Sequence, residues 1–227
     1  MNLETTQLLA LAAALGWASG LRLYAVLFLT GLAGHLGWVA LPPGLQLLQN
    51  PWLLGASGSM LLIEFFADKI PGVDTLWDLV HTLIRIPAGA ALAAAVFGAD
   101  QSTWATAPAL LGGSLAATSH VAKTTTRAAL NTSPEPFSNV AISLLGDATV
   151  PAALWLAFAH PLVALAAVAL ASLAMLAIIV VLIKFLRALW SRLRGDNRPD
   201  ADGRDLAPRV GAGRVSCDSN SNARPLK

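Results

Sequence analysis

Six apolar stretches separated by helix breakers fill most of the first 186 residues, and no other feature limits the possible folds as strongly. Most of them approach the ~20 residues that an α-helix needs to cross a lipid bilayer. Breakers such as Leu41-Pro42-Pro43-Gly44 and His160-Pro161 lie between them. The pattern predicts an all-α polytopic membrane helix bundle of about six spans, at residues 8–40, 52–66, 76–98, 105–117 with a polar extension to 130, 140–159 and 162–186.

The composition excludes a soluble globular protein. Hydrophobic residues make up 56% of the 227 residues and charged residues 12%, whereas a soluble domain carries about 25% charged residues. Such a chain cannot cover itself with polar surface, so residues 1–194 are expected to form one transmembrane helical domain. Residues 195–227 hold many charges and no aromatic residue, which predicts a disordered cytoplasmic tail.

Charge and cysteine content exclude further classes of protein. The formal net charge of +2 rests on few residues and gives no dense basic face, so no nucleic-acid partner is expected. Cys217 is the only cysteine, which excludes an intramolecular disulfide and a cysteine metal cluster. The expected partners are the lipid bilayer and a small ion or solute, and a homo-oligomer is left open.

Basic residues near the ends of the spans predict the orientation in the membrane. The last span runs into four of them, Lys184, Arg187, Arg192 and Arg194, so the C-terminus is expected in the cytoplasm. With six spans, the N-terminus lies on the same side. No lysine or arginine occurs in the loops then assigned to the outside, at residues 37–51, 99–104 and 160–161.

The first apolar stretch is too long for one straight crossing, so we expect it to be tilted, broken at Gly20, or divided into two segments. A weak internal repeat accompanies it, because residues 14–20 resemble 114–120 and residues 66–71 resemble 145–151. Three spans per half would give the halves opposite topology. The repeat therefore predicts two inverted three-span repeats with broken helices, at 8–98 and 105–186, a recurrent transporter design.

Ionisable residues gather in the predicted spans and mark a candidate site. Glu64 and Asp68 share one helical face, and four residues of the next span form a single stripe that ends just before Pro87-Ala88-Gly89, where we expect an interruption of the helix. Ionisable side chains in membrane spans usually face the bundle interior or a wet cavity. The candidate path residues are Arg22, Glu64, Asp68, Asp74, Asp78, His81, Arg85, His120, Lys123, Arg127 and Asp147.

Three interpretations of this set are open. In the first, five basic residues, which include Lys69, pair with five acidic residues in a structural network. In the second, the residues line a path for a substrate or an ion. In the third, they form a metal-dependent catalytic site, for which Asp68, Asp78 and His81 are weak candidate ligands. A divalent cation is the one cofactor that remains open, and no catalytic residue is assigned.

Several segments carry a family resemblance. Ser19-Gly20-Leu21-Arg22-Leu23-Tyr24, residues 67–74 with Trp77-Asp78 and His81, residues 85–90 and residues 126–139 resemble an uncharacterised family of bacterial integral membrane proteins known as domain of unknown function 4126. The similarity covers about residues 8–185, and Ser133-Pro134-Glu135-Pro136-Phe137-Ser138-Asn139 is its most specific part. The resemblance implies a multi-pass protein of the bacterial inner membrane and supplies no activity.

A weaker similarity links Leu145-Gly146-Asp147-Ala148-Thr149, and less closely Glu64, Asp68 and Lys69, to acidic motifs of two-repeat cation transporters that export manganese or calcium. Together these patterns favour a small secondary transporter or channel that moves an inorganic cation or small charged solute through a polar cavity open to the cytoplasm. The alternative is a membrane scaffold or assembly factor that docks a partner through its cytoplasmic loop 131–139. A membrane-embedded enzyme is the third hypothesis.

Overall fold

The computed structural model of the chain describes residues 4–70, 72–98, 105–130 and 136–193. The predicted tail at 195–227 and residues 131–135 of the predicted docking loop lie outside this part. Every regular element within it is helical, in agreement with the predicted fold class. In chain order these are α1 (Thr5–His35), the 3-10 helix η1 (Pro43–Gln49), α2 (Pro51–Ala67), α3 (Val73–Val96), α4 (Thr106–Leu130), α5 (Pro136–Ala159) and α6 (Pro161–Leu193).

The helix ends follow from the breakers in the sequence. α2 starts at Pro51, whose missing N–H is not needed in a first turn, and the side chain of Asn50 accepts a hydrogen bond from the Trp52 amide at 2.9 Å. Gly72, with φ of 89°, turns the chain from α2 into α3, a conformation that favours glycine. This short turn brings the acidic end of α2 beside the acidic start of α3.

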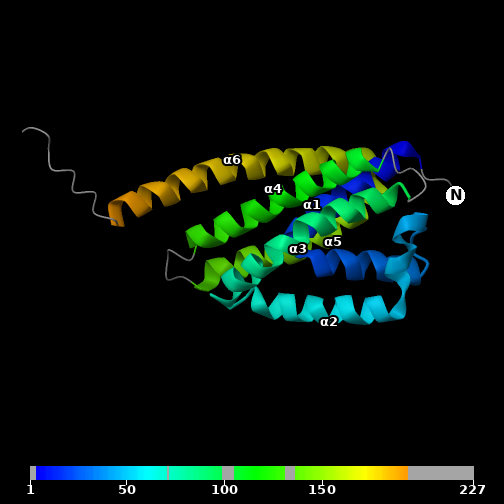
Figure 1. Ribbon diagram of the computed structural model, residues 1–227, viewed down its shortest axis with the longest axis horizontal. Helices are drawn as coiled ribbons and strands as arrows, with labels where there is room; N and C mark the ends of the chain where they lie inside the picture. Colours follow the sequence, from blue (N-terminus) through cyan, green and yellow to red (C-terminus); the bar gives the residue numbers. More distant parts are fainter. Residues whose placement is uncertain (1–3, 71, 99–104, 131–135, 194–227) are drawn as a thin grey trace, which may run out of the picture.

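The first helix reverses direction at Arg22, the one residue inside α1 with non-helical backbone angles (φ −148°, ψ 85°). Before the break, Gly16 faces Gly112 and Gly20 faces Ala116, so this arm runs parallel to α4. After the break, Gly58 lies against Phe28, and Gly31 approaches the side chain of Leu54, so the second arm runs antiparallel to α2. Because α2 and α4 run in the same direction (Figure 1), the two arms of α1 form a helical hairpin. The predicted break is confirmed, two residues after Gly20.

The hairpin occupies the centre of the molecule, and α2 to α6 surround it (Figure 1). Most residues of its first arm are buried, and the hydrophobic core is built around them with side chains from η1, α3, α5 and α6. The packing of α1 against all five later helices places Arg22, at the tip of the hairpin, inside the bundle, where its side chain is 2% exposed.

Glycines allow α1, α3 and α4 to cross closely. A Cβ atom on Gly16 would overlap the backbone of Gly112, and one on Gly112 would overlap the side chain of Ala93 and the Gly89 carbonyl. Small residues of this kind let membrane helices approach at backbone distance. Pro87 lies next to this crossing, yet α3 continues without a break from Val73 to Val96. The expected interruption at 87–89 is therefore wrong, because the neighbouring helices support the backbone there.

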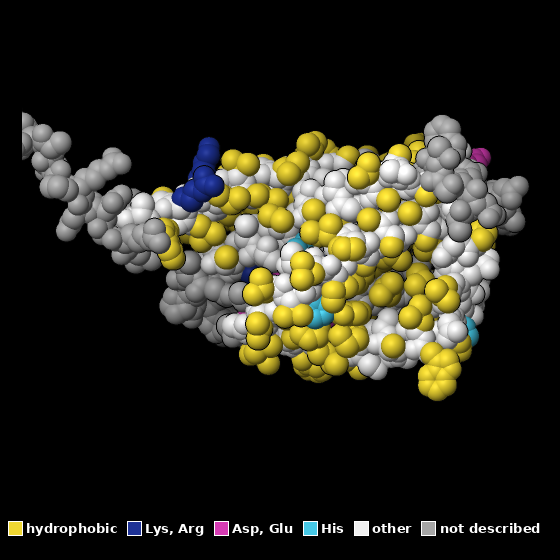
Figure 2. All heavy atoms as spheres, viewed as in Figure 1, with side chains coloured by type: hydrophobic (Ala, Val, Ile, Leu, Met, Phe, Trp, Pro, Cys, Tyr) yellow, Lys and Arg dark blue, Asp and Glu magenta, His cyan; other side chains and the backbone are white. Residues whose placement is uncertain are grey.

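Within the described residues, four helical segments are long and apolar enough to cross a membrane: Thr5–His35, Leu76–Val96, Val140–Ala159 and Pro161–Ser191. α2 is apolar but shorter. Large hydrophobic side chains, among them Leu83, Leu110, Leu170 and Leu173, are exposed on the outside of the bundle. Figure 2 shows hydrophobic side chains spread over the length of one face, with Lys and Arg gathered toward one end. Such a surface fits the hydrocarbon region of a bilayer better than water.

Two expectations about topology change because α1 turns back. Thr5 and the end of α6 lie at opposite ends of the long axis (Figure 1), so the expectation that both termini share one side does not fit this arrangement. The inverted repeats also gain no support. The first arm of α1, which carries residues 14–20, runs parallel to α4 with its matching residues 114–120, whereas inverted halves would place these segments antiparallel.

Candidate functional site

Ten charged side chains from α1 to α5 meet around the tip of the α1 hairpin and form what we call the charge cluster. Ion pairs of 4.0 Å or less connect all of them. Five are acids and five are bases, so the cluster is neutral overall. The pairing predicted from the sequence is confirmed. The members of the charge cluster are Arg22, Glu64, Asp68, Lys69, Asp74, Asp78, Arg85, Lys123, Arg127 and Asp147.

Asp68 and Asp78 form the centre of the charge cluster. Asp68, at the end of α2, lies 2.8 Å from Arg22 and 2.9 Å from Arg127. Asp78, one turn into α3, lies 2.7 Å from Arg85 and 2.8 Å from Arg127. Both carboxylates are buried and each is shared by three basic residues, since both also contact Lys123. Buried charges are costly unless they are paired. The shared bases meet this requirement for both carboxylates and connect α1, α3 and α4 through one network of ion pairs.

Arg22 links the two halves of the chain. Its guanidinium lies 2.6 Å from Asp147 of α5 and donates a hydrogen bond of 3.0 Å to the hydroxyl of Ser143. Lys69 also reaches Asp147, at 3.3 Å, and donates to the Phe65 carbonyl. Asp147 is 20% exposed, so this end of the charge cluster borders the surface. Ser143 was not among the path residues predicted from the sequence.

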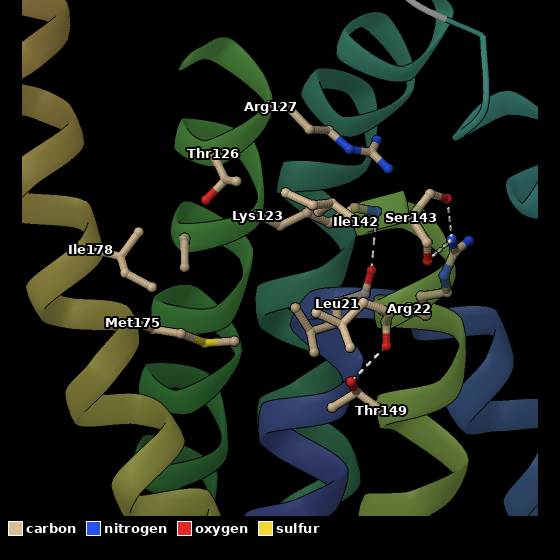
Figure 3. A pocket seen from close by; sticks show the side chains of 13 residues that line it. Leu21, Arg22, Lys123, Thr126, Arg127, Ile142, Ser143, Thr149, Met175 and Ile178 are labelled. Atoms are coloured by element: carbon tan, nitrogen blue, oxygen red, sulfur yellow. Dashed lines mark hydrogen bonds between the residues drawn. The ribbon is translucent and has the colours of Figure 1, made fainter. Parts of the chain in front are cut away.

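Lys123 of α4 sits in a cage of three oxygen atoms. Its Nζ lies 3.1 Å from Asp68 Oδ2, 3.2 Å from Asp78 Oδ1 and 3.1 Å from the carbonyl oxygen of Leu21. The Leu21 carbonyl comes from the end of the first arm of α1, where the break at Arg22 interrupts the helical pattern (Figure 3). A cation at this position also suits the negative end of a helix dipole. We call Asp68 Oδ2, Asp78 Oδ1 and the Leu21 carbonyl oxygen the oxygen cage.

Two uncharged neighbours, Thr82 of α3 and His120 of α4, extend the charge cluster at Arg85. Arg85 pairs with Glu64 of α2 as well as with Asp78, and both Arg85 and Glu64 are fully buried. His120 contacts the Arg85 guanidinium at 3.4 Å and the hydroxyl of Thr82 at 2.7 Å. Thr82 itself donates to the Asp78 carbonyl. His120 was a predicted path residue, and Thr82 was not.

His81 is the one predicted path residue that lies apart from the charge cluster. Its Nδ1 atom donates to the Trp77 carbonyl at 2.8 Å, and its Nε2 atom lies 3.1 Å from the hydroxyl of Tyr24. The ring also stacks on Trp77 with centroids 4.2 Å apart. Among the described residues, no group of three or more His, Cys, Asp or Glu side chains is arranged to hold a metal ion.

The charges fill the space between the helices instead of lining one wide cavity, but two smaller cavities border them. One, of about 160 Å³, lies between α1, α4, α5 and α6 (Figure 3). Lys123, Thr126 and Ser143 contribute to its wall, and the apolar side chains of Met175 and Ile178 close it. The other, of about 360 Å³, lies between α3 and α4 and is lined by Asp78, Thr82, Thr124, Thr125 and Arg127 among others. Leu21, whose carbonyl belongs to the oxygen cage, lines the first cavity, and Asp78 lines the second.

The sequence matches the family described as domain of unknown function DUF4126 over residues 9–183. The chain belongs to this family. The match spans the whole hairpin and the charge cluster, and it ends within α6. Comparison with curated proteins and with solved structures finds no match. All side chains of the alternative docking loop at 131–139 lie outside the described part.

Proposed function

We propose that this family member is a small membrane transporter for an inorganic cation or another small charged solute. The observation that carries the proposal is the oxygen cage. Two buried carboxylates and a backbone carbonyl at a helix break surround one positive charge, 3.1–3.2 Å from each oxygen. Broken helices in transporters use freed carbonyls in this way to coordinate cations near the middle of the membrane.

The arrangement of the charges also supports a working site. Asp68 and Asp78 are each shared by three bases, so no single base is the sole partner of either carboxylate. Shared partners allow one cation to leave while the others keep the carboxylates paired. Ionisable groups inside membrane domains mark ion and substrate paths by default, and residues of the oxygen cage line two cavities.

The charge distribution supports an orientation in the bacterial inner membrane. The loops between η1 and α2, α3 and α4, and α5 and α6 contain no lysine or arginine, while Lys184 and Arg187 lie toward the C-terminal end of α6. Positively charged ends stay in the cytoplasm. We therefore propose that the C-terminal end of α6 faces the cytoplasm and that the start of α1 faces the opposite side.

Uptake by proteoliposomes tests the proposed function. The purified full chain is reconstituted and offered a panel of labelled inorganic cations and small charged solutes. We expect uptake of at least one of them, and a loss of at least about tenfold, equal to ~1.4 kcal/mol, in Asp68→Asn. Lys184→Gln is the matched control, because Lys184 is exposed and lies outside the charge cluster. Equal uptake by wild type and Asp68→Asn, or no uptake of any solute by wild type, would contradict the proposal.

A further inference from the structure

A further cavity adjoins the 160 Å³ cavity that borders the charge cluster. It measures about 230 Å³ and lies between α1, α5 and α6, with Trp17 and Ala164 among its lining residues. Thr149 of α5 lines both cavities, so the two meet there. We call the pair of cavities the α5–α6 crevice. It follows residues 142–156 of α5, a length of about 21 Å at 1.5 Å per residue.

The two ends of the α5–α6 crevice differ in chemistry. Three bases, Arg22, Lys123 and Arg127, line one end, and among the described residues the carboxylates that pair with them do not. The other end is lined by Trp17 and by small apolar side chains, mostly alanine. Guanidinium and ammonium groups recognise phosphate and carboxylate. The crevice as a whole therefore suits an amphiphile with an anionic head and an apolar chain.

Trp17 supplies a hydrogen-bond donor within the apolar part of the crevice. Its side chain is 3% exposed, and its Nε1 atom has no hydrogen-bond partner among the described residues. Because buried polar groups normally have a partner, this N–H suits an acceptor that the occupant brings. Trp17 precedes Arg22 by five residues, about 7.5 Å along the helix axis. A phospholipid carries its groups in the matching order, with a phosphate, a glycerol unit, an ester carbonyl and then the acyl chain.

We propose that the α5–α6 crevice binds one acyl chain of an anionic phospholipid from the surrounding bilayer. The phosphate lies at the end lined by the three bases, the ester carbonyl accepts a hydrogen bond from Trp17 Nε1, and the chain continues toward Ala164. The inference goes beyond the proposed function, because binding a lipid requires no transport.

The walls of the crevice favour the bilayer as the source of this ligand. Leu145 and Ile178 line the basic end and are 66% and 45% exposed, so this wall reaches the outer surface of the bundle. Figure 3 shows Met175 and Ile178 of α6 across the cavity from Lys123. A lipid at this wall can keep its second chain in the membrane. A free phosphate would leave the apolar part of the crevice unfilled.

Thermal unfolding of the full chain in detergent tests the ligand class. The probes are phosphatidylglycerol, phosphatidylcholine with the same acyl chains, and glycerol phosphate. We expect phosphatidylglycerol to raise the Tm by about 3–6 °C at about ten times its Kd, with a smaller rise from phosphatidylcholine and none from glycerol phosphate. An equal rise with phosphatidylcholine would overturn the anionic site. An equal rise with glycerol phosphate would show a site for free phosphate and contradict the lipid assignment.

A pair of variants tests the place of binding. Ala167 lines the apolar part of the crevice and Ala166 lines neither of its cavities, and both residues are exposed. Neither Ala167→Phe nor Ala166→Phe should therefore disturb folding. We expect Ala167→Phe to block the crevice and lose the rise in Tm with phosphatidylglycerol, whereas Ala166→Phe keeps it. Equal rises in the two variants would overturn the inference.

Tryptophan fluorescence in proteoliposomes supplies a measurement that does not depend on a blocked crevice. Bromine quenches tryptophan only at short range, so phosphatidylglycerol with brominated chains should quench the wild type more than equally brominated phosphatidylcholine at the same fraction. Trp17→Phe should lose this difference and, without the N–H, should bind phosphatidylglycerol about three- to tenfold more weakly. Equal quenching of the wild type by the two lipids, or a difference that persists in Trp17→Phe, would show that no anionic lipid occupies the crevice.

Discussion

At the residue scale, Asp78 is one of the two carboxylates that three bases share, and it contacts Arg85, Lys123 and Arg127. Asp78→Asn removes one charge and leaves three buried bases with fewer partners. We expect it to lower the free energy of unfolding by about 3–5 kcal/mol, as for the loss of one partner of a buried ion pair. Asp147→Asn, at a position that is 20% exposed, should lose clearly less. Thermal unfolding in detergent compares the two, and equal losses would contradict this ranking.

Charge balance makes a second prediction about the same residues. Asp78→Asn combined with Lys123→Met removes one negative and one positive charge that lie 3.2 Å apart. The double variant should be more stable than the sum of the single effects implies, with a coupling of about 0.5–3 kcal/mol. A double-mutant cycle of unfolding free energies measures it. Additive losses would show that the two charges do not interact in the folded protein.

Helical spacing predicted which residues form the charge cluster but could not assign their partners. Asp74, Asp78, His81 and Arg85 all turn inward, as one stripe of an α-helix must. Yet His81 meets Tyr24 and not the carboxylates, because Tyr24 follows the reversal of α1. Ser143 and Thr82 could not be predicted as partners for a different reason: a single serine or threonine in an apolar helix carries no periodic signal.

At the scale of elements, the close crossing of α1, α3 and α4 depends on glycine. Gly16→Val should destabilise the protein by about 3 kcal/mol or more, at the upper end for an overpacked site, because its Cβ would overlap the Gly112 backbone. Gly55→Ala is the matched control. No atom lies within 4 Å of a Cβ placed at Gly55, so the change should stabilise α2 by about 0.5–1 kcal/mol. Similar Tm values for the two variants would contradict the crossing.

The helices were largely predictable from apolar stretches and breakers, as α2 and α4 illustrate, whereas the reversal inside α1 was predictable only as a break. Arg22 is neither glycine nor proline, so nothing local specifies its extended backbone. Side chains of α4 stabilise the break from outside, since Lys123 donates to the Leu21 carbonyl and Ser119 donates to the Trp17 carbonyl at 2.7 Å. The reversal thus depends on contacts with other helices. The predicted repeats of three spans each did not include it.

At the scale of the whole molecule, the two ends of the described chain lie at opposite ends of the long axis (Figure 1), and we propose that they face opposite sides of the membrane. We expect Thr5→Cys, in a Cys217→Ser background, to react with a membrane-impermeant maleimide in intact cells. Ser191→Cys should react only after permeabilisation. Both positions are exposed, so burial does not limit labelling. Equal labelling of the two positions in intact cells would show that α1 crosses the membrane fully instead of turning back.

The proposed function requires that the charge cluster takes part in transport and does not only hold the helices together. The most direct measurement is solute flux in proteoliposomes by the charge-balanced Asp78→Asn/Lys123→Met variant, compared with wild type at matched protein density and with unfolding curves of both. We expect a folded variant whose flux falls at least about tenfold, equal to ~1.4 kcal/mol. Flux at the wild-type rate in this variant would contradict the claim and leave the charge cluster a structural network.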